Sequence, residues 1–247
     1  MNKFYCSFSL VLIVTMFGGC ETDRCFHASG KETEKIMLKG HFNRIHIHGM
    51  FDIELVQDSC YYVEGFAGYK ILENIDVSVK NDTLLLYDFN GCFWLREYKR
   101  PLLRVHFKDI DVVNIYEASY IFSTDSVTDH FMLASQTMLA ETNLLLNTEY
   151  FYFYVHHTTG GRYVFRGKSQ SAYMSGYYSS VIDASELECS SVVVRNNSIA
   201  DIKVWATEEI KAEIYNSGNI YYKGNPSVIT DSLMSTGRLL PMVAANN

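Results

Sequence analysis

The chain has little positive charge and no dense run of it. Of its 247 residues, 21 are Lys or Arg and 28 are Asp or Glu, so the formal net charge is −7. A protein that binds nucleic acid needs a basic face for the phosphates, and this balance argues against nucleic acid as the main partner. Hydrophobic residues make up 48% and charged residues 20%, which indicates a globular chain rather than a disordered one.

Helical patterns and catalytic signatures are also missing. No long stretch between residues 36 and 110 carries the apolar stripe of an amphipathic helix. No G-x-S-x-G or similar context surrounds any serine. Proline (3) is scarce, whereas tyrosine (18) and phenylalanine (15), which favour strands, are abundant. The chain is therefore expected to be all-β.

The one long apolar run lies at the N-terminus. "FSLVLIVTMF" (8–17) follows Lys3 and is too short to span a bilayer comfortably. "FGGC", which ends at Cys20, resembles the lipobox of bacterial lipoproteins, and "ETD" (21–23) resembles the surface-export signal of Bacteroidetes lipoproteins. We expect residues 1–19 to be a signal peptide and Cys20 to carry a lipid that anchors the exported protein to the outer membrane, facing the periplasm or the cell surface. A plain signal peptide cleaved nearby is the alternative.

The remaining cysteines do not have the spacing of a metal or redox motif. No two cysteines form C-x-x-C, which leaves zinc-ribbon and thioredoxin-like sites without support. In an exported protein, four cysteines could form disulfides in three pairings, or they could stay free and buried. The sequence leaves this open for Cys25, Cys60, Cys92 and Cys189.

Residues 20–35 are polar and aperiodic, and they are expected to form a tether. From residue 36 onward, the sequence has the alternating pattern that is typical of β-strands. In "RIHIHGMFDIEL" (44–55), apolar and polar residues alternate, so one side of each strand faces inward. A short loop through Gly49 would make this stretch a hairpin. Residues 36–110 are thus expected to form an N-terminal β-hairpin and sheet region, with "KND" (80–82) as a turn between strands.

After about residue 110 the sequence repeats. A shift of 20 residues aligns 171–185, 191–205 and 211–225 without gaps. A period near 20 with short strands in each repeat is typical of a β-solenoid, whose stacked rungs share one core. The L-x-x-L-x-L register of a leucine-rich repeat is absent from this sequence, which argues against that fold. The gapless shift of 20 residues disfavours an antiparallel sandwich. We expect rungs over 111–240 and a tail at 241–247. The aligned columns are Ala172/Val192/Ala212, Met174/Val194/Ile214 and Ile182/Ile202/Tyr222.

These motifs together resemble a known family. "IHIHGMFDIEL", "IDVSVKNDTLLLY" and the terminal "GNIYYKGNPSV" (218–228) are similar to segments of the putative auto-transporter adhesin, head GIN domain family, which is common in Bacteroidetes. The resemblance covers residues 36–240, although most corners here differ from the G-S-G typical of that family. It implies a right-handed parallel β-helix after an N-terminal β region, and it implies no catalytic residues.

One cluster could bind a metal. His46 and His48 lie two apart on a strand, and Asp52 and Glu54 follow, so a divalent ion on that strand face is one hypothesis. The alternative, which we prefer, is a solvated face with His–carboxylate cross-strand pairs. No metal and no cofactor are therefore expected.

Tyrosines on the repeat form the main candidate ligand surface. By alternation they should face outward, and sugars pack well on aromatic rings, so a glycan or an envelope protein is the expected ligand. Alternatively, they are only good strand formers on the coil exterior. The candidates are Tyr152, Tyr154, Tyr173, Tyr215 and Tyr221.

Enzymatic activity is not expected. Outward columns such as Asp183/Lys203/Lys223 lack the stacked carboxylates that polysaccharide cleavage needs. The sequence thus predicts a lipid-anchored envelope protein for adhesion or ligand recognition. A polysaccharide-processing or sensing accessory protein and a structural spacer remain alternatives, and the oligomeric state is open.

Overall fold

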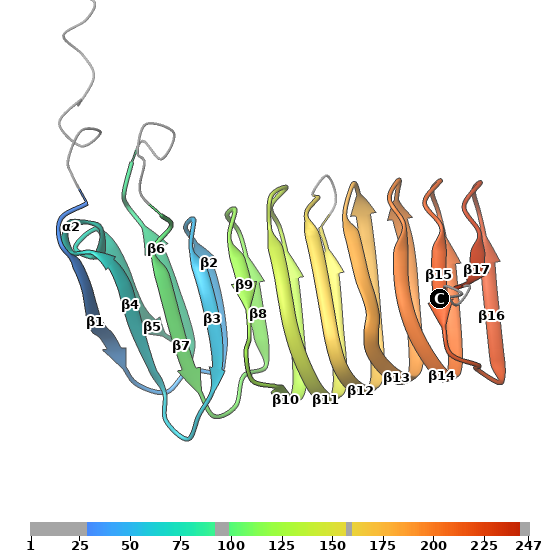
Figure 1. The fold of residues 1–247 in the computed structure, drawn as a ribbon, viewed down its shortest axis with the longest axis horizontal. Helices are drawn as coiled ribbons and strands as arrows, with labels where there is room; N and C mark the ends of the chain where they lie inside the picture. The colour runs from blue at the N-terminus through green and yellow to red at the C-terminus, as the bar shows by residue number, and fades with distance from the viewer. Residues whose placement is uncertain (1–28, 92–98, 157–159, 243–247) are drawn as a thin grey trace, which may run out of the picture.

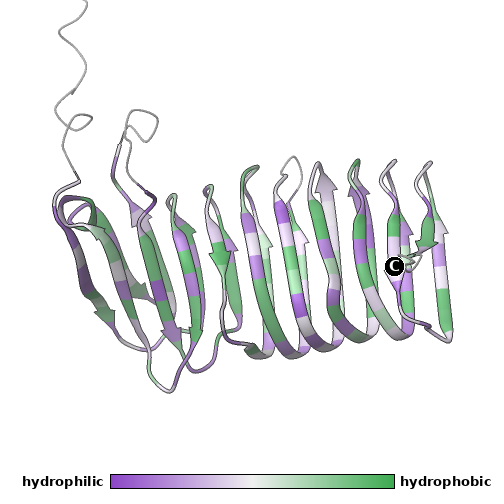
Figure 2. Cartoon of the chain, viewed as in Figure 1, coloured by the Kyte–Doolittle hydropathy of each residue, from purple (hydrophilic) through white to green (hydrophobic). Residues whose placement is uncertain are grey.

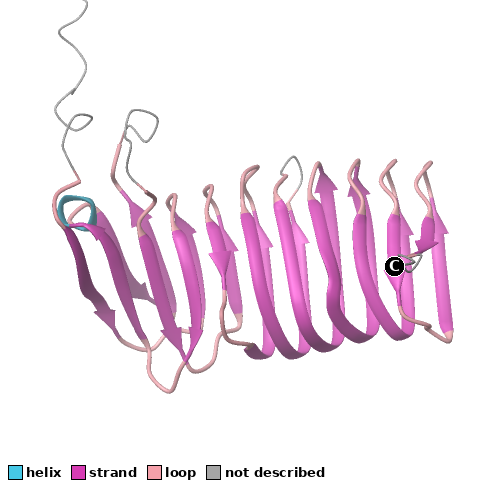
Figure 3. Cartoon of the chain, viewed as in Figure 1, coloured by secondary structure: helices cyan, strands magenta, loops and turns pink. Residues whose placement is uncertain are grey.

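The computed structural model describes residues 29–91, 99–156 and 160–242. These residues fold almost entirely into strands joined by short turns, with one short helix, α2 (Tyr69–Leu72) (Figure 3). No helix within these ranges is long and apolar enough to cross a membrane. In chain order the strands are β1 (Glu32–Lys39), β2 (Arg44–His48), β3 (Asp52–Gln57), β4 (Tyr62–Gly68), β5 (Ile75–Lys80), β6 (Thr83–Asp88), β7 (Leu102–Phe107), β8 (Val112–Ile115), β9 (Tyr120–Phe122), β10 (Val127–Ser135), β11 (Glu141–Val155), β12 (Arg162–Tyr178), β13 (Val181–Ser198), β14 (Ile202–Ile214), β15 (Ile220–Lys223), β16 (Val228–Leu233) and β17 (Leu239–Pro241).

The strands coil into a parallel β-solenoid with two walls (Figure 1). The β2 wall stacks β6, β2, β8, the C-terminal halves of β10 to β14, and β16. The β3 wall stacks β7, β3, β9, the N-terminal halves of β11 to β14, and then β15 and β17. Each long strand from β11 to β14 bends from the β3 wall into the β2 wall. The predicted parallel β-helix is confirmed.

Alternate residues of each strand fill the space between the walls. The burial pattern of β11 alternates along most of its length, and the hydropathy colouring alternates in the same way along the coil (Figure 2). Inward residues of successive rungs stack in columns and are almost completely buried. Each buried aliphatic or aromatic side chain contributes about 1.5–3 kcal/mol to stability. One such column is Phe131, Phe151, Ala172, Val192 and Ile210.

The repeat is not uniform along the coil. Ala172 pairs with Val192, as the 20-residue shift predicts, but Val192 pairs with Ile210 and not with Ala212. Register shifts between β13 and β14 cause this slip of two residues. A slip of two keeps every side chain on its own face, so alternation in the sequence does not reveal it. The other two predicted columns change in the same way: Met174/Val194 continue to Ala212, and Ile182/Ile202 continue to Ile220.

The predicted hairpin over 44–55 is wrong. Strand β2 pairs in parallel with β6 and β8, whereas β3 pairs in parallel with β7 and β9. Gly49 therefore lies at a corner where the chain passes from the β2 wall to the β3 wall, and a Cβ there would collide with the Phe51 ring. A hairpin strand and a half-buried solenoid strand have the same period of two, so the sequence pattern alone does not separate them.

The rung made by β2 and β3 also lies out of sequence order. It is inserted between the β6–β7 rung and the β8–β9 rung, so the coil starts upstream of residue 111, within the stretch expected to be a separate β region. In Figure 1, β6 and β7 lie nearer the N-terminal end of the coil than β2 and β3 do. The chain must therefore leave the coil after β3 and return to it at β6.

The N-terminal end of the coil carries a cap, which we define as β1, β4, α2 and β5. Strand β1 precedes β2, and the other three elements form the excursion between β3 and β6. Strand β4 pairs antiparallel with β7, β1 with β4, and β5 with β6. Part of the expected tether, residues 32–35, thus belongs to β1. The "KND" turn is confirmed, since Asn81 and Asp82 have φ of 51° and 56° between β5 and β6. These antiparallel strands cover the backbone edges that the first rung would otherwise expose.

A pair of double-cysteine variants tests the inserted rung. His46 pairs with Asn114 in parallel strands, where Cα atoms lie about 4.8 Å apart. That distance suits a disulfide, so His46→Cys/Asn114→Cys should cross-link under mild oxidation. His46→Cys/Glu54→Cys should not, because these positions lie on different walls. Peptide mass spectrometry under non-reducing conditions measures both. Cross-linking of the second pair alone would contradict the inserted rung and support a hairpin.

Candidate ligand-binding surface

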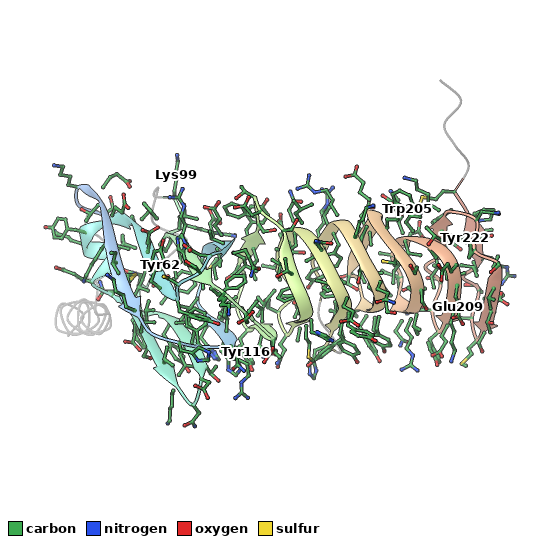
Figure 4. The ribbon with its side chains drawn as sticks, turned by 90° about the horizontal axis from the view of Figure 1, so that it is seen from below. Tyr62, Lys99, Tyr116, Trp205, Glu209 and Tyr222 are labelled. Carbon is green, nitrogen blue, oxygen red and sulfur yellow. The ribbon has the colours of Figure 1, made fainter. Side chains whose placement is uncertain are left out.

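Aromatic side chains gather on the outside of the β2 wall. They lie at outward positions of neighbouring rungs, and we call them the aromatic face: His46, His48, Tyr87, Tyr116, Tyr150, Tyr152, Tyr154 and Tyr173. In Figure 4, Tyr116 and Glu209 project from one side of the coil, whereas Lys99 and Trp205 project from the opposite side. The two walls therefore present separate surfaces.

His48 is stacked between two tyrosines. Its ring centroid lies 4.6 Å from that of Tyr87 and 4.3 Å from that of Tyr116, with interplanar angles of 9° and 6°. Burial lowers the pKa of His48, against the opposing charge of Glu117, and burial together with His48 and Arg44 lowers the pKa of His46. Both imidazoles are thus biased towards the neutral form at neutral pH.

The structure separates the candidate metal ligands. His46 and His48 lie on the β2 wall, whereas Asp52 and Glu54 lie on the β3 wall beside β7 and β9. Glu54 instead forms an ion pair with Arg104 at 2.7 Å. In the described ranges, no group of three or more His, Cys, Asp or Glu side chains is placed to hold a metal ion. The expected His–carboxylate pairs across a hairpin do not form either.

Tyr152 and Tyr173 form a second stack. Their centroids lie 4.4 Å apart with an interplanar angle of 7°, and Tyr154 contacts Tyr152 edge-on at 5.8 Å. The side chain of Tyr152 is 41% exposed. Partial burial, together with the neighbours Tyr173 and Tyr154, raises the pKa of its hydroxyl group. Because stacked rings cover each other's faces, a ligand on this surface meets ring edges and hydroxyl groups. CH–π packing on a free ring face is therefore not the main contact that these tyrosines offer.

A charged network continues the aromatic face towards the C-terminus. Arg195 donates to the hydroxyl oxygen of Tyr173 at 3.3 Å, and its Nε lies 2.6 Å from Glu213. Tyr215 donates to the same carboxylate at 3.0 Å, and Lys211 approaches it at 3.4 Å. Desolvation would raise the pKa of Glu213, but the hydrogen bonds and charges of Arg195, Tyr215 and Lys211 hold it below its ordinary value.

The remaining predicted tyrosine lies elsewhere. Tyr221 belongs to β15 on the β3 wall, where it pairs with Lys203 and Leu240. That part of the β3 wall is held by charged contacts, including the Asp183–Lys203 ion pair at 3.3 Å. The structure therefore brings Tyr152, Tyr154, Tyr173 and Tyr215 to one wall and separates Tyr221 from them.

Sequence reasoning missed part of this surface. Tyr87 and Tyr116 join it only because β2 lies between β6 and β8. Tyr150 stacks on His130 at 4.9 Å, one outward position before Tyr152. The alternation of "YFYFYV" could have identified Tyr150, whereas nothing in the sequence places Tyr87 beside His48.

Two of the four cysteines that could form disulfides lie in the described part of the chain. Cys60 is an exposed free thiol and Cys189 is a buried one. Burial, reinforced by Glu188, raises the pKa of Cys189 to about 12, so this thiol is unreactive at neutral pH. Cys25, Cys92 and the expected lipidation site Cys20 lie outside the described residues.

Comparisons with known proteins agree with this architecture. The sequence pattern of the family described as "Putative auto-transporter adhesin, head GIN domain" matches residues 41–226. The curated proteins include no match to the chain.

Solved structures give the same fold. The chain is similar to a putative adhesin from Bacteroides fragilis NCTC 9343, with 19% identity and a TM-score of 0.78 over 86% of this chain and 97% of the other. It is also similar to a putative lipid binding protein from Parabacteroides distasonis ATCC 8503, with 17% identity and a TM-score of 0.63 over 87% and 98%. A putative adhesin from the same species gives 18% identity and a TM-score of 0.61 over 86% and 98%. At these identities, the likeness establishes the fold alone.

Glu213→Gln tests the network beside the stack. The amide cannot balance Arg195, so the variant should lose about 1–3 kcal/mol of stability at neutral pH, or about 2–10 °C in melting temperature. The carboxylate contributes fully above its ordinary pKa of 4.5, and this contribution is lost as pH falls through its lower folded-state pKa. The difference between parent and variant should therefore shrink below pH 4.5.

Thermal unfolding across this pH range measures the effect. Glu209→Gln, on the same strand but exposed, is the matched control and should change the melting temperature little. An equal loss at acidic and neutral pH would contradict the role of the Glu213 charge.

Proposed function

Because the chain belongs to the putative auto-transporter adhesin, head GIN domain family, we propose that it is a non-enzymatic recognition protein of the cell envelope. Its ligand is a saccharide chain that lies along the aromatic face. The family and two of the structural relatives carry adhesin names, which agrees with a binding role.

The observation that supports this proposal is the clustering of exposed aromatic rings on one wall. The coil is already held together by its buried columns, so the fold does not require aromatic residues outside it. Tyr150 is 50% exposed and Tyr152 is 41% exposed, on adjacent outward positions of one strand. Exposed aromatic patches of this kind are typical of interaction surfaces.

The geometry also indicates how a saccharide would bind. Stacked tyrosines present a row of hydroxyl groups at the spacing of the rungs, about 4.8 Å. Arg195 adds a guanidinium group beside Tyr173. Sugar hydroxyls both donate and accept hydrogen bonds, so this polar row matches them better than it matches an apolar partner.

A non-enzymatic role rests on the polar groups of the coil exterior. The carboxylates of Asp183 and Glu213 are each engaged by a Lys or Arg at 3.3 Å or less. Such ion pairs lower the basicity that a general acid or base needs. A polysaccharide-processing role is therefore the less favoured alternative.

A lipid ligand has less support. One structural relative is a putative lipid binding protein, but a lipid needs an apolar cavity. Here the space between the walls is filled by buried columns such as Phe131, Phe151 and Ala172. A lipid in that space would have to displace them.

The proposed location is the outer membrane. We propose that residues 1–19 are removed and that Cys20 carries the lipid anchor, as the lipobox-like "FGGC" indicates. The lipid would tie the capped N-terminal end of the coil to the membrane, and the aromatic face would extend away from it. Metabolic labelling with a fatty-acid analogue, compared between the parent and Cys20→Ser, tests this anchor.

The binding experiment uses purified residues 21–247 on an array of neutral and acidic polysaccharides. Tyr152→Phe and Tyr173→Phe keep the stack but remove the hydroxyls, so each should weaken binding about 2-fold to 12-fold, the effect of one lost hydrogen bond. Tyr221→Phe, the same change on the β3 wall, should bind as the parent does.

Four results would change the proposal. Equal loss in all three variants would remove the aromatic face as the binding surface. If both face variants bound as tightly as the parent, the hydroxyl row would be irrelevant. Shortening of a retained polysaccharide would show an enzyme, and no retention of any polysaccharide would favour a structural spacer.

A further inference from the structure

Two adjoining cavities lie on the β3 wall, where the cap meets the coil. One has a volume of about 410 Å³ and the other about 260 Å³, and Tyr120 lines both. We call them together the junction groove. Its lining includes Asp52, Arg100, Tyr120, Phe122, Glu141 and Arg162.

The cap supplies part of the lining of the larger cavity. Phe66 and Ala67 of β4 and Ile71 of α2 form one side of the larger cavity, and Arg100, just before β7, forms another. Further along, the smaller cavity runs over β9, β11 and β12. Cap residues therefore line one end of the groove, and strands of the coil line the other.

The charges in the groove balance. Asp52 lies near Arg100, which opposes the effect of burial on its pKa, and Glu141 pairs in register with Arg162. Lys99 and Glu32 also line the larger cavity and have opposite charges. A strongly anionic or cationic ligand would meet as much repulsion as attraction here, so the groove favours a neutral ligand.

Polar atoms of the groove are also poorly hydrated. Burial raises the pKa of Asp52, which means that its carboxylate has lost part of its water shell. Asn143 lines the smaller cavity, and its Oδ1 atom is buried with no hydrogen-bond partner among the described residues. Buried acceptors are normally satisfied, so this position favours a ligand that brings hydrogen-bond donors.

The floor of the groove is aromatic. The rings of Tyr120 and Phe122 lie 5.3 Å apart, 18° from parallel, and both side chains line the larger cavity. Both are only partly buried. Unlike the ladders of the β2 wall, these rings belong to one strand, and their rung neighbours Asp52, Glu141 and Asn143 are not aromatic.

We propose that the junction groove binds the end of a neutral oligosaccharide of a few sugar units. The outward positions from Asp52 through Tyr120 and Glu141 to Arg162 span three rung steps, or about 14 Å. The ligand's apolar C–H groups pack on Tyr120 and Phe122, and its hydroxyls donate to Asp52 and Asn143. The cap blocks the chain at one end, which selects a terminus rather than the middle of a polymer.

This inference rests on the proposed function, saccharide recognition, and adds a second site on the opposite wall. It gives the two walls different roles. The aromatic face holds a long chain along its length, and the junction groove holds the terminus of a short one. The two sites therefore respond to different variants and to different lengths of ligand.

The test uses the purified protein and a panel of neutral di- to tetrasaccharides, with acidic saccharides of the same length for comparison. Saturation-transfer NMR detects binding, and titration gives the affinity. Tyr120→Ala should lower the affinity at least 5-fold, and Asp52→Asn and Asn143→Leu about 3-fold to 10-fold. Tyr221→Phe, on the same wall but outside both cavities, is the control and should leave short-chain affinity unchanged.

Thermal unfolding shows whether each variant folds, and Asp52→Asn, which keeps size and shape, decides the question if Tyr120→Ala does not fold. Parental affinity in all groove variants, or an equal loss in Tyr221→Phe, would overturn the groove. A preference for acidic saccharides would overturn the neutral class. If polysaccharides bind but no short saccharide does, the inference fails and the proposed function stands. If neither binds, both fail.

Discussion

Every rung of this coil depends on the backbone hydrogen bonds that its strands make with the rungs on either side. A single rung has two short walls and buries little apolar surface, so it has no stable fold of its own. Parallel pairing supplies partners for the N–H and C=O groups and brings inward side chains of like position into columns. The same pairing fixes the rung spacing at about 4.8 Å, and that distance governs the surface as well as the core.

The need to satisfy the backbone explains the irregular N-terminal end. The first rung of a solenoid exposes unpaired edges on both walls, which would invite pairing with other chains. Here β4 and β5 pair antiparallel with β7 and β6 and cover these edges. The chain builds β4, α2 and β5 of this cap during the excursion between β3 and β6, and it returns to the coil by adding a rung on the N-terminal side of the one it has already made.

Rung spacing also accounts for the aromatic ladders. Rings at the same outward position on adjacent rungs lie close to the distance at which aromatic rings stack, as the 4.4 Å between Tyr152 and Tyr173 illustrates. Such ladders stabilise the coil and orient the hydroxyls at the same time. On the β3 wall, the cap interrupts the regular surface and leaves a groove in which Tyr120 and Phe122 have no aromatic rung neighbours. One repeat thus yields two surfaces with different chemistry.

The sequence by itself determined the strands, the faces of those strands and the existence of a coil. Alternation in "RIHIHGMFDIEL" identified Ile45, Ile47, Phe51, Ile53 and Leu55 as inward residues, and all are fully buried. Alternation reports only the side on which a residue lies, because pairing partners are set by contacts distant in the chain. The tertiary structure alone decided that β2 stacks between β6 and β8, that His48 meets Tyr87 and Tyr116, and that the last rungs slip by two residues. It also decided that Tyr221 lies apart from Tyr152, since strand order and register assign each outward residue to a wall and a neighbour.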